Sequence, residues 1–262
     1  MRAVSLMYHD VVSPGAEEES GFPGGHSRIY KLHTELFSAH LDAVAASGAS
    51  VCNDVRALTA ASRPAVLFTF DDGGVSFLDP IAGMLEARGW RGHFFITTGR
   101  VGSPGFLTAA QVRELAGRGH IVGSHSVHHP TRMAELPAAH MSEEWAESRK
   151  ALADLLGAAV DTASVPGGYY SRQVAVSAAD AGFGHLFHSE PVTRVDTTGP
   201  LRLYGRFAFL SSSSASLAGR LAQDDAGTRA RFWTIRQVKK LAKKAGGDWL
   251  VRLHARRLNG PR

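Results

Sequence analysis

Short apolar stretches alternate along the chain with stretches in which apolar residues recur at helical spacing. This alternation is typical of a parallel sheet wrapped by helices, an α/β fold. The apolar stretches predict seven strands, a number close to that of a closed barrel. We expect them at residues 3–8, 65–70, 92–97, 120–123, 160–165, 183–188 and 201–209. Because chemistry in such folds gathers where parallel strands end, polar residues that follow a strand are the candidate site residues.

Helices are predicted between these strands. Apolar residues at helical spacing predict one helix over residues 36–44 and another over residues 77–85, each followed by a glycine. Residues 108–111, Thr-Ala-Ala-Gln, form a capping box that predicts a helix start. Ser142, followed by two glutamates, predicts the start of a further helix, because acidic side chains stabilise the positive end of a helix dipole.

The composition is that of an ordinary globular protein, since 44% of the 262 residues are hydrophobic and 20% are charged. No apolar run approaches the ~20 residues that span a bilayer, which argues against the disordered and membrane-spanning classes. The first ten residues contain one basic residue and an apolar stretch too short for a signal peptide. We therefore expect a cytoplasmic protein.

The net charge of +5 is concentrated near the C-terminus, where residues 229–262 hold eleven Lys and Arg and one acidic residue. We expect a single barrel domain over residues 1–210 and a basic, helical extension over residues 211–262. Its predicted helix packs on the domain through an apolar stripe and leaves a solvated basic side; the stripe comprises Ile235, Val238, Leu241, Ala242 and Ala245. The alternative is attraction to an anionic membrane surface or a phosphate-bearing substrate. No nucleic-acid partner is expected, because no recognition motif accompanies the charge.

Two clusters of polar residues follow predicted strands. Asp71 and Asp72 come after the strand at 65–70, where one carboxylate could bind a metal while the other accepts a proton; simple turn chemistry is the alternative. His125 and His129 are four residues apart, which places both imidazoles within reach of one ion, while His128 between them is expected to face solvent. Since the chain has a single cysteine, any metal site must use His and carboxylate ligands.

A third polar motif follows the strand at 160–165 and reads Pro166-Gly167-Gly168-Tyr169-Tyr170. Glycines permit close approach of the backbone, so the amide of Tyr169 or Tyr170 could donate to an oxyanion while the rings line a sugar-sized groove. A glycine turn into a helix would give the same pattern.

The three motifs together resemble the polysaccharide deacetylase family, also called the NodB homology domain or carbohydrate esterase family 4. The resemblance runs from about residue 3 to about residue 210 and implies a distorted (β/α) barrel. It also implies a divalent metal, usually zinc, held by Asp72, His125 and His129, with Asp71 as the catalytic base.

The activity implied by the resemblance is metal-dependent removal of an N-acetyl group from an amino sugar or sugar-containing intermediate, with release of acetate. Three protein ligands leave zinc an open position for water, whose pKa falls toward about 7. Two alternatives stay open: hydrolysis of a small non-sugar amide at the same metal site, and a catalytically silent carbohydrate-binding relative.

The chain departs from the family pattern at two points. Family members commonly begin the third motif with an Arg that braces the catalytic Asp, whereas this chain has Ser164; Arg172 or Arg206 could supply the brace from elsewhere. The family also has a late Leu-x-His motif whose His protonates the leaving amine, and it has no clear match here. His188 is the first candidate for that acid and His9 the second, because both end predicted strands.

Overall fold

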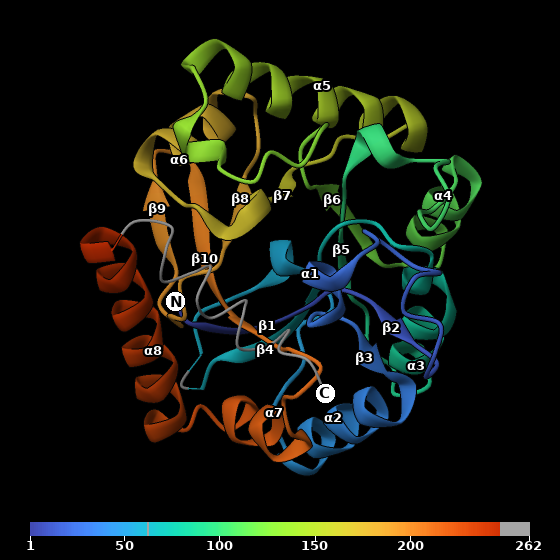
Figure 1. Ribbon diagram of the computed structural model, residues 1–262, viewed down its shortest axis with the longest axis vertical. Helices are drawn as coiled ribbons and strands as arrows, with labels where there is room; N and C mark the ends of the chain where they lie inside the picture. Colours follow the sequence, from blue (N-terminus) through green and yellow to red (C-terminus); the bar gives the residue numbers. More distant parts are fainter. Residues whose placement is uncertain (62, 247–262) are drawn as a thin grey trace.

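The computed structural model describes residues 1–61 and 63–246. Seven parallel strands form a closed barrel in the order β1, β4, β5, β6, β7, β8 and β10, and β10 pairs back with β1. Helices surround this barrel (Figure 1). The predicted distorted (β/α) barrel is therefore confirmed.

All seven predicted strands are present, with ends that differ from the prediction by a few residues at most. They are β1 (Ala3–Tyr8), β4 (Ala65–Phe70), β5 (His93–Ile96), β6 (Ile121–Ser124), β7 (Thr162–Ser164), β8 (His185–His188) and β10 (Leu201–Ala208). Three short strands were not predicted, because they carry too little of a pattern. Of these, β9 (Asp196–Thr198) runs antiparallel to β10, and β2 (Val11–Val12) pairs with β3 (Leu32–His33).

The α-helices are α1 (Gly25–Arg28), α2 (Thr34–Ala46), α3 (Gly83–Glu86), α4 (Ala109–Gly117), α5 (Ala138–Leu156), α6 (Arg172–Asp180), α7 (Ala215–Ala222) and α8 (Ala226–Gly246). Short helical turns are η1 (Val55–Ala57), η2 (Val75–Phe77), η3 (Leu78–Ala82), η4 (Thr98–Arg100), η5 (Met133–Glu135) and η6 (Pro166–Gly168). The predicted capping box at the start of α4 is confirmed, since the Gln111 amide donates to Thr108 Oγ1 and the Thr108 amide donates to Gln111 Oε1.

Two helix predictions were wrong in detail. The stretch at 77–85 is broken into η2, η3 and α3, with non-helical angles at Asp79 (φ −141°, ψ 118°). Pro80 follows Asp79, and a proline both lacks an N–H and disfavours the helical region for the residue before it. Ser142 does not start a helix but lies within α5, which begins at Ala138.

The barrel interior is packed with side chains. Phe95 of β5 and Phe187 of β8 belong to strands that are not neighbours, yet their ring centroids lie 5.1 Å apart, so their contact crosses the interior. Tyr204 of β10 stacks on Phe187 at 4.8 Å. Because the interior is filled, ligand chemistry belongs at the rim of the barrel.

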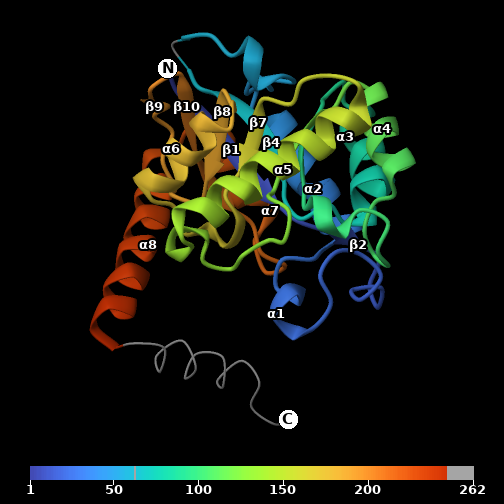
Figure 2. The same cartoon turned by 90° about the horizontal axis from the view of Figure 1, so that it is seen from above.

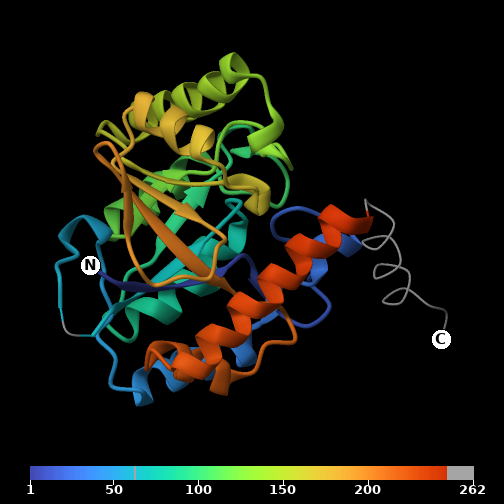
Figure 3. The same ribbon diagram turned by 90° about the vertical axis from the view of Figure 1, so that its left-hand side faces the viewer.

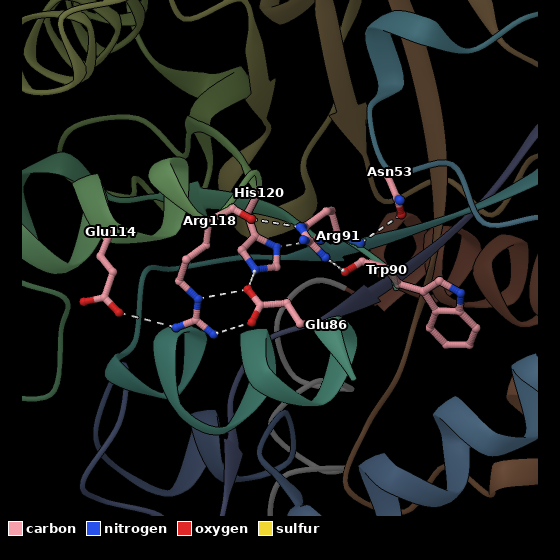
Figure 4. Close-up of polar contacts among 8 residues, drawn as sticks. Asn53, Glu86, Trp90, Arg91, Glu114, Arg118 and His120 are labelled. Atoms are coloured by element: carbon pink, nitrogen blue, oxygen red, sulfur yellow. Dashed lines mark hydrogen bonds and ion pairs between the residues drawn. The ribbon is translucent and has the colours of Figure 1, made fainter. Parts of the chain in front are cut away.

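A polar network stabilises the end of the barrel where β5 and β6 begin (Figure 4). Glu86 at the end of α3 accepts two hydrogen bonds from Arg118, at 2.9 and 2.7 Å, and one from His120 Nε2 at 2.9 Å. The other ring nitrogen of His120 accepts from the Gly92 amide at 3.0 Å, and Arg91 Nε donates to the Arg118 carbonyl at 2.8 Å. These contacts join α3 to the residues that follow α4 and precede both strands.

The C-terminal helices lie against the barrel in different ways. Helix α7 packs on α2 through close contact of Gly219 with Ala43, whereas α8 runs along the outside of the barrel (Figure 3). Phe232 of α8 meets Phe207 of β10 edge-on, with ring centroids 5.4 Å apart. None of the helices within the described residues has the length and apolar character that crossing a bilayer requires.

The predicted apolar stripe of α8 does not pack on the barrel where it can be followed. Ile235 and Val238 are 45% and 58% exposed, so their part of the prediction was wrong. The helix docks instead through Phe232 and the partly buried Arg236, which lie on a neighbouring face. The side chains of Leu241, Ala242 and Ala245, together with residues 247–262, lie outside the described residues.

Candidate active site

Four candidate residues come together where β4 and β6 end. Asp71 and Asp72 directly follow β4, and His125 directly follows β6. Asp72 and His129 have positive φ angles of 92° and 55°, which are unfavourable for residues other than glycine. Such backbone strain persists only where the surrounding structure holds it, and it is concentrated at functional sites.

Asp72, His125 and His129 form a cluster suited to a metal ion. Asp72 Oδ1 lies 3.4 Å from Nε2 of His125 and 3.4 Å from Nε2 of His129. Two ligands about 2.1 Å from a tetrahedral ion lie about 3.4 Å apart. Asp72 Oδ1 is buried and has no hydrogen bond of normal geometry. A metal ion bound by the cluster would supply this oxygen with a partner.

Contacts behind the imidazoles fix their orientation and protonation. His125 Nδ1 donates to the Ser164 carbonyl at 3.0 Å, which directs Nε2 toward Asp72. Burial lowers the pKa of His125, but the Asp71 and Asp72 carboxylates outweigh burial and raise it above its usual value. Burial, reinforced by the neighbouring His125, lowers the pKa of His129 to about 4, so its ring is neutral at neutral pH. Phe22 packs against the His129 ring with centroids 5.0 Å apart.

Arg206 braces Asp71. Its Nη1 and Nη2 atoms donate to the two carboxylate oxygens at 2.6 and 2.8 Å, and both side chains are buried. Burial raises the pKa of Asp71, but the charges of Arg206 and His125 outweigh it and hold that pKa well below its usual range. Of the two arginines considered for this role, Arg172 instead begins α6 with its side chain exposed.

Glu144 supports the second motif, a role that could not be predicted from sequence. From α5 its carboxylate accepts from the amides of Val127 and His128 at 2.9 and 3.0 Å, and from His128 Nδ1 at 2.7 Å. The His128 side chain is 74% exposed, so the prediction that it faces solvent is confirmed. Glu144 thus holds the segment between the two proposed ligands.

The third motif forms a tight turn after β7. Gly167 and Gly168 have φ angles of 63° and 70°, and a Cβ on Gly167 would lie 2.1 Å from the Thr131 carbonyl oxygen. Glycine is therefore required at Gly167. The Arg132 guanidinium lies over the Tyr169 ring, 5.5 Å from its centroid, and Pro166 is buried.

The two candidates for the general acid have different surroundings. His188 ends β8, where its Nδ1 accepts from the Glu190 amide at 3.2 Å and its ring lies 4.7 Å from that of Tyr170. His9 packs on Tyr30 at 4.6 Å. Burial raises the pKa of Asp72, but the imidazoles of His125 and then His9 outweigh burial and lower that pKa below its usual value.

Comparison with known proteins agrees with this geometry. The family model described as polysaccharide deacetylase matches residues 59–185, the segment that contains both Asp residues, both proposed His ligands and the glycine turn. Over this segment the chain is similar to the polysaccharide deacetylases. His9, His188 and Arg206 lie outside the matched segment.

One curated relative, YxkH of Bacillus subtilis (strain 168), carries a polysaccharide deacetylase name and is 26% identical over 192 residues. The match covers 71% of this chain and spans 64% of the length of YxkH. The relationship to polysaccharide deacetylases therefore rests on an alignment that extends well beyond the short motifs.

Solved structures of deacetylases share the fold. A de-N-acetylase from Aggregatibacter actinomycetemcomitans superposes with a TM-score of 0.69 at 18% identity, covering 88% of this chain and all of its own. IcaB from Ammonifex degensii gives a TM-score of 0.68 at 22% identity, with 85% of this chain and 97% of that one covered. The Streptococcus pyogenes deacetylase PplD gives 0.67 at 19% identity, with 82% and 95% covered.

Proposed function

We propose that this chain is a metal-dependent hydrolase that removes an N-acetyl group from an amino sugar or a sugar-containing intermediate and releases acetate. The observation that carries the proposal is the metal-ligand cluster of Asp72, His125 and His129 beside the buried pair of Asp71 and Arg206. A metal-ligand set next to a separate, ionised carboxylate is the arrangement that hydrolysis of an amide needs.

Asp72, His125 and His129 would hold the ion, and one oxygen with two imidazole nitrogens is a donor set that suits zinc. When bound, such an ion polarises the amide carbonyl and lowers the pKa of a water molecule toward about 7. The Ser164 carbonyl keeps the His125 ring in the tautomer that binds metal through Nε2.

Asp71 would accept the proton of the attacking water, since it is ionised and its carboxylate lies 3.9 Å from the proposed ligand His125. Arg206 fixes both carboxylate oxygens, so the base has one orientation. The turn of Gly167 and Gly168 would present backbone amides to the oxyanion. His188 is the preferred donor of a proton to the leaving amine, and His9 is the alternative.

Tyr169 and Tyr170 follow the turn and would line the groove that takes the sugar. The basic C-terminal extension would draw the enzyme toward an anionic membrane surface or a phosphate-bearing substrate, in keeping with the eleven basic residues of 229–262. The cytoplasmic location and the domain boundary after residue 210 also remain predictions.

A substrate panel tests the proposed function. Zinc-loaded protein is incubated with N-acetylglucosamine oligomers, acetylated sugar intermediates and small non-sugar amides, and acetate or amine release is quantified. We expect acetate from at least one sugar. Turnover of small amides alone would favour an amidase, and tight sugar binding without turnover would favour a silent binding protein.

A further inference from the structure

Helix α8 lies outside the segment matched by the family model but beside the candidate site. Figure 2 shows its C-terminal end projecting on the same side of the barrel as α1, which belongs to the loop that follows β1. The helix is anchored on the barrel wall by Phe232, which packs on Phe207. One turn further along, Arg236 reaches toward the segments that follow β7 and β8.

Arg236 joins two of these segments. Its Nη2 donates to the Gly168 carbonyl at 3.0 Å and to Glu190 Oε1 at 2.9 Å, and its Nε donates to the same carboxylate oxygen at 3.2 Å. Both charged side chains are largely covered, at 28% and 20% exposure. A planar guanidinium serves both acceptors at once, which a lysine ammonium reproduces poorly.

Each tethered segment leads to a proposed functional group. Gly168 belongs to the glycine turn, whose two glycines have the largest conformational entropy to lose and no side chain with which to hold the turn. The Glu190 amide donates to His188, and the Glu190 carbonyl accepts from the Arg206 amide at 3.0 Å. Glu190 therefore lies between α8 and both the candidate acid and the brace of Asp71.

We propose that Arg236 is a positioning residue, which acts from α8 to hold the glycine turn and the His188–Glu190 segment in the arrangement that turnover requires. This inference rests on the proposed deacetylase function. Phe232 also packs on the barrel wall, so α8 keeps one anchoring contact when the Arg236 contacts are removed. Helix α8 then supports the candidate site through Arg236.

The test compares full-length Arg236→Gln and Arg236→Lys with Arg231→Gln, a matched loss of charge at an exposed position of the same helix. We measure kcat and KM of each variant with N-acetylglucosamine oligomers as substrate. We expect kcat to fall about 10- to 100-fold in Arg236→Gln, because small displacements at an active site cost up to about that factor, with a smaller change in KM. Arg236→Lys should recover part of the loss, and Arg231→Gln should match wild type.

Zinc affinity should change less than about twofold, because none of the three proposed ligands contacts Arg236. Combining Arg236→Gln with Glu190→Gln should reduce kcat no further than the more damaging single change, as expected for two residues acting through one contact. Unchanged kcat in Arg236→Gln, or an equal loss in Arg231→Gln, would overturn the proposal. So would a loss of activity fully matched by loss of zinc or of thermal stability.

Hydrogen exchange separates this inference from the proposed function, because it needs no turnover. Amides of residues 167–170 and 188–190 should exchange faster in Arg236→Gln than in Arg231→Gln, while those of the metal-ligand segment 124–129 stay as in wild type. Absence of acetate release from wild type would count against the deacetylase alone. Unchanged exchange at 167–170 and 188–190 would refute the positioning role.

Discussion

At the scale of single residues, the buried pair of Asp71 and Arg206 is the most consequential contact of the candidate site. Removing one partner of a buried ion pair leaves the other charge without compensation, at a cost of about 3–5 kcal/mol. Arg206→Met should therefore lower the free energy of unfolding by about that amount in urea titrations. The double variant Asp71→Asn/Arg206→Met should recover part of the loss, whereas strictly additive losses would contradict the pair.

The general acid is open to a second test at this scale. A leaving amine is expelled well only when it is protonated, and histidine has an ordinary pKa near 6.5. His188→Ala and His9→Ala should each be assayed for kcat against pH. The variant without the acid should lose the fall in rate at alkaline pH, and we expect this of His188→Ala. Retention of that fall by both variants would exclude both histidines.

The brace of Asp71 also shows where prediction from sequence stops. Arg206 and Asp71 are 135 residues apart, and closure of the barrel between β10 and β1 is what brings them together. Spacing along the chain could nominate Arg206 but could not choose between it and Arg172. The role of Glu144 could not be predicted from sequence either, because its contacts with the second motif depend on how α5 packs.

At the scale of elements, the network around Glu86 joins α3 to the strands β5 and β6 at the end of the barrel opposite the site (Figure 4). Its hydrogen bonds to Arg118 and His120 lower the pKa of Glu86 to about 2, so it is ionised at neutral pH. Glu86→Gln should cost about 1–3 kcal/mol and reduce the melting temperature by several degrees without changing kcat.

Glu114→Gln is the matched control for that change. Glu114 pairs with the same Arg118 at 3.5 Å, but it is more than half exposed, so its loss should cost less than about 1 kcal/mol. Thermal unfolding followed by circular dichroism gives both values. Equal destabilisation by the two variants would show that the network contributes no more than a surface ion pair.

The elements themselves were predictable to different degrees. Each of the seven barrel strands was found from the sequence, although only some, such as β4, are mostly apolar, and β7 reads Thr-Ala-Ser. The continuous helix expected over 77–85 is absent, because the prediction followed the apolar spacing and did not take account of Pro80, at which the helix breaks. The prediction for the docking face of α8 was also wrong. Ile235 and Val238 are exposed, whereas Phe232, three residues before Ile235, packs on the barrel.

At the scale of the whole molecule, stability should depend on pH through His93. Its Nδ1 donates to the Phe68 carbonyl and its Nε2 accepts from the Val55 amide, so the neutral ring links β5, β4 and η1. Burial lowers the pKa of His93 to about 4. Between that value and about 6.5 the unfolded chain binds the additional proton, so stability falls as the pH is lowered through this range.

The expected loss from this single group is about 3 kcal/mol, and below pH 4 its contribution no longer changes. Urea unfolding at a series of pH values measures it. His93→Gln should be less stable at neutral pH but should show a shallower decline between pH 6.5 and 4. An equally steep decline in that variant would assign the pH dependence to other groups.

If Asp72, His125 and His129 hold the ion on which the proposed deacetylation depends, reloading of chelated protein with zinc should restore activity in proportion to bound metal. Chelated protein receives zinc stepwise while bound metal and acetate release from N-acetylglucosamine oligomers are measured together. Acetate release should be absent at the start and reach its maximum at one equivalent. Asp71→Asn should bind the same equivalent but turn over about 10²–10⁴-fold more slowly, and His125→Ala should lose most binding. Full activity of chelated wild type, or one tightly bound equivalent in His125→Ala, would contradict this metal site.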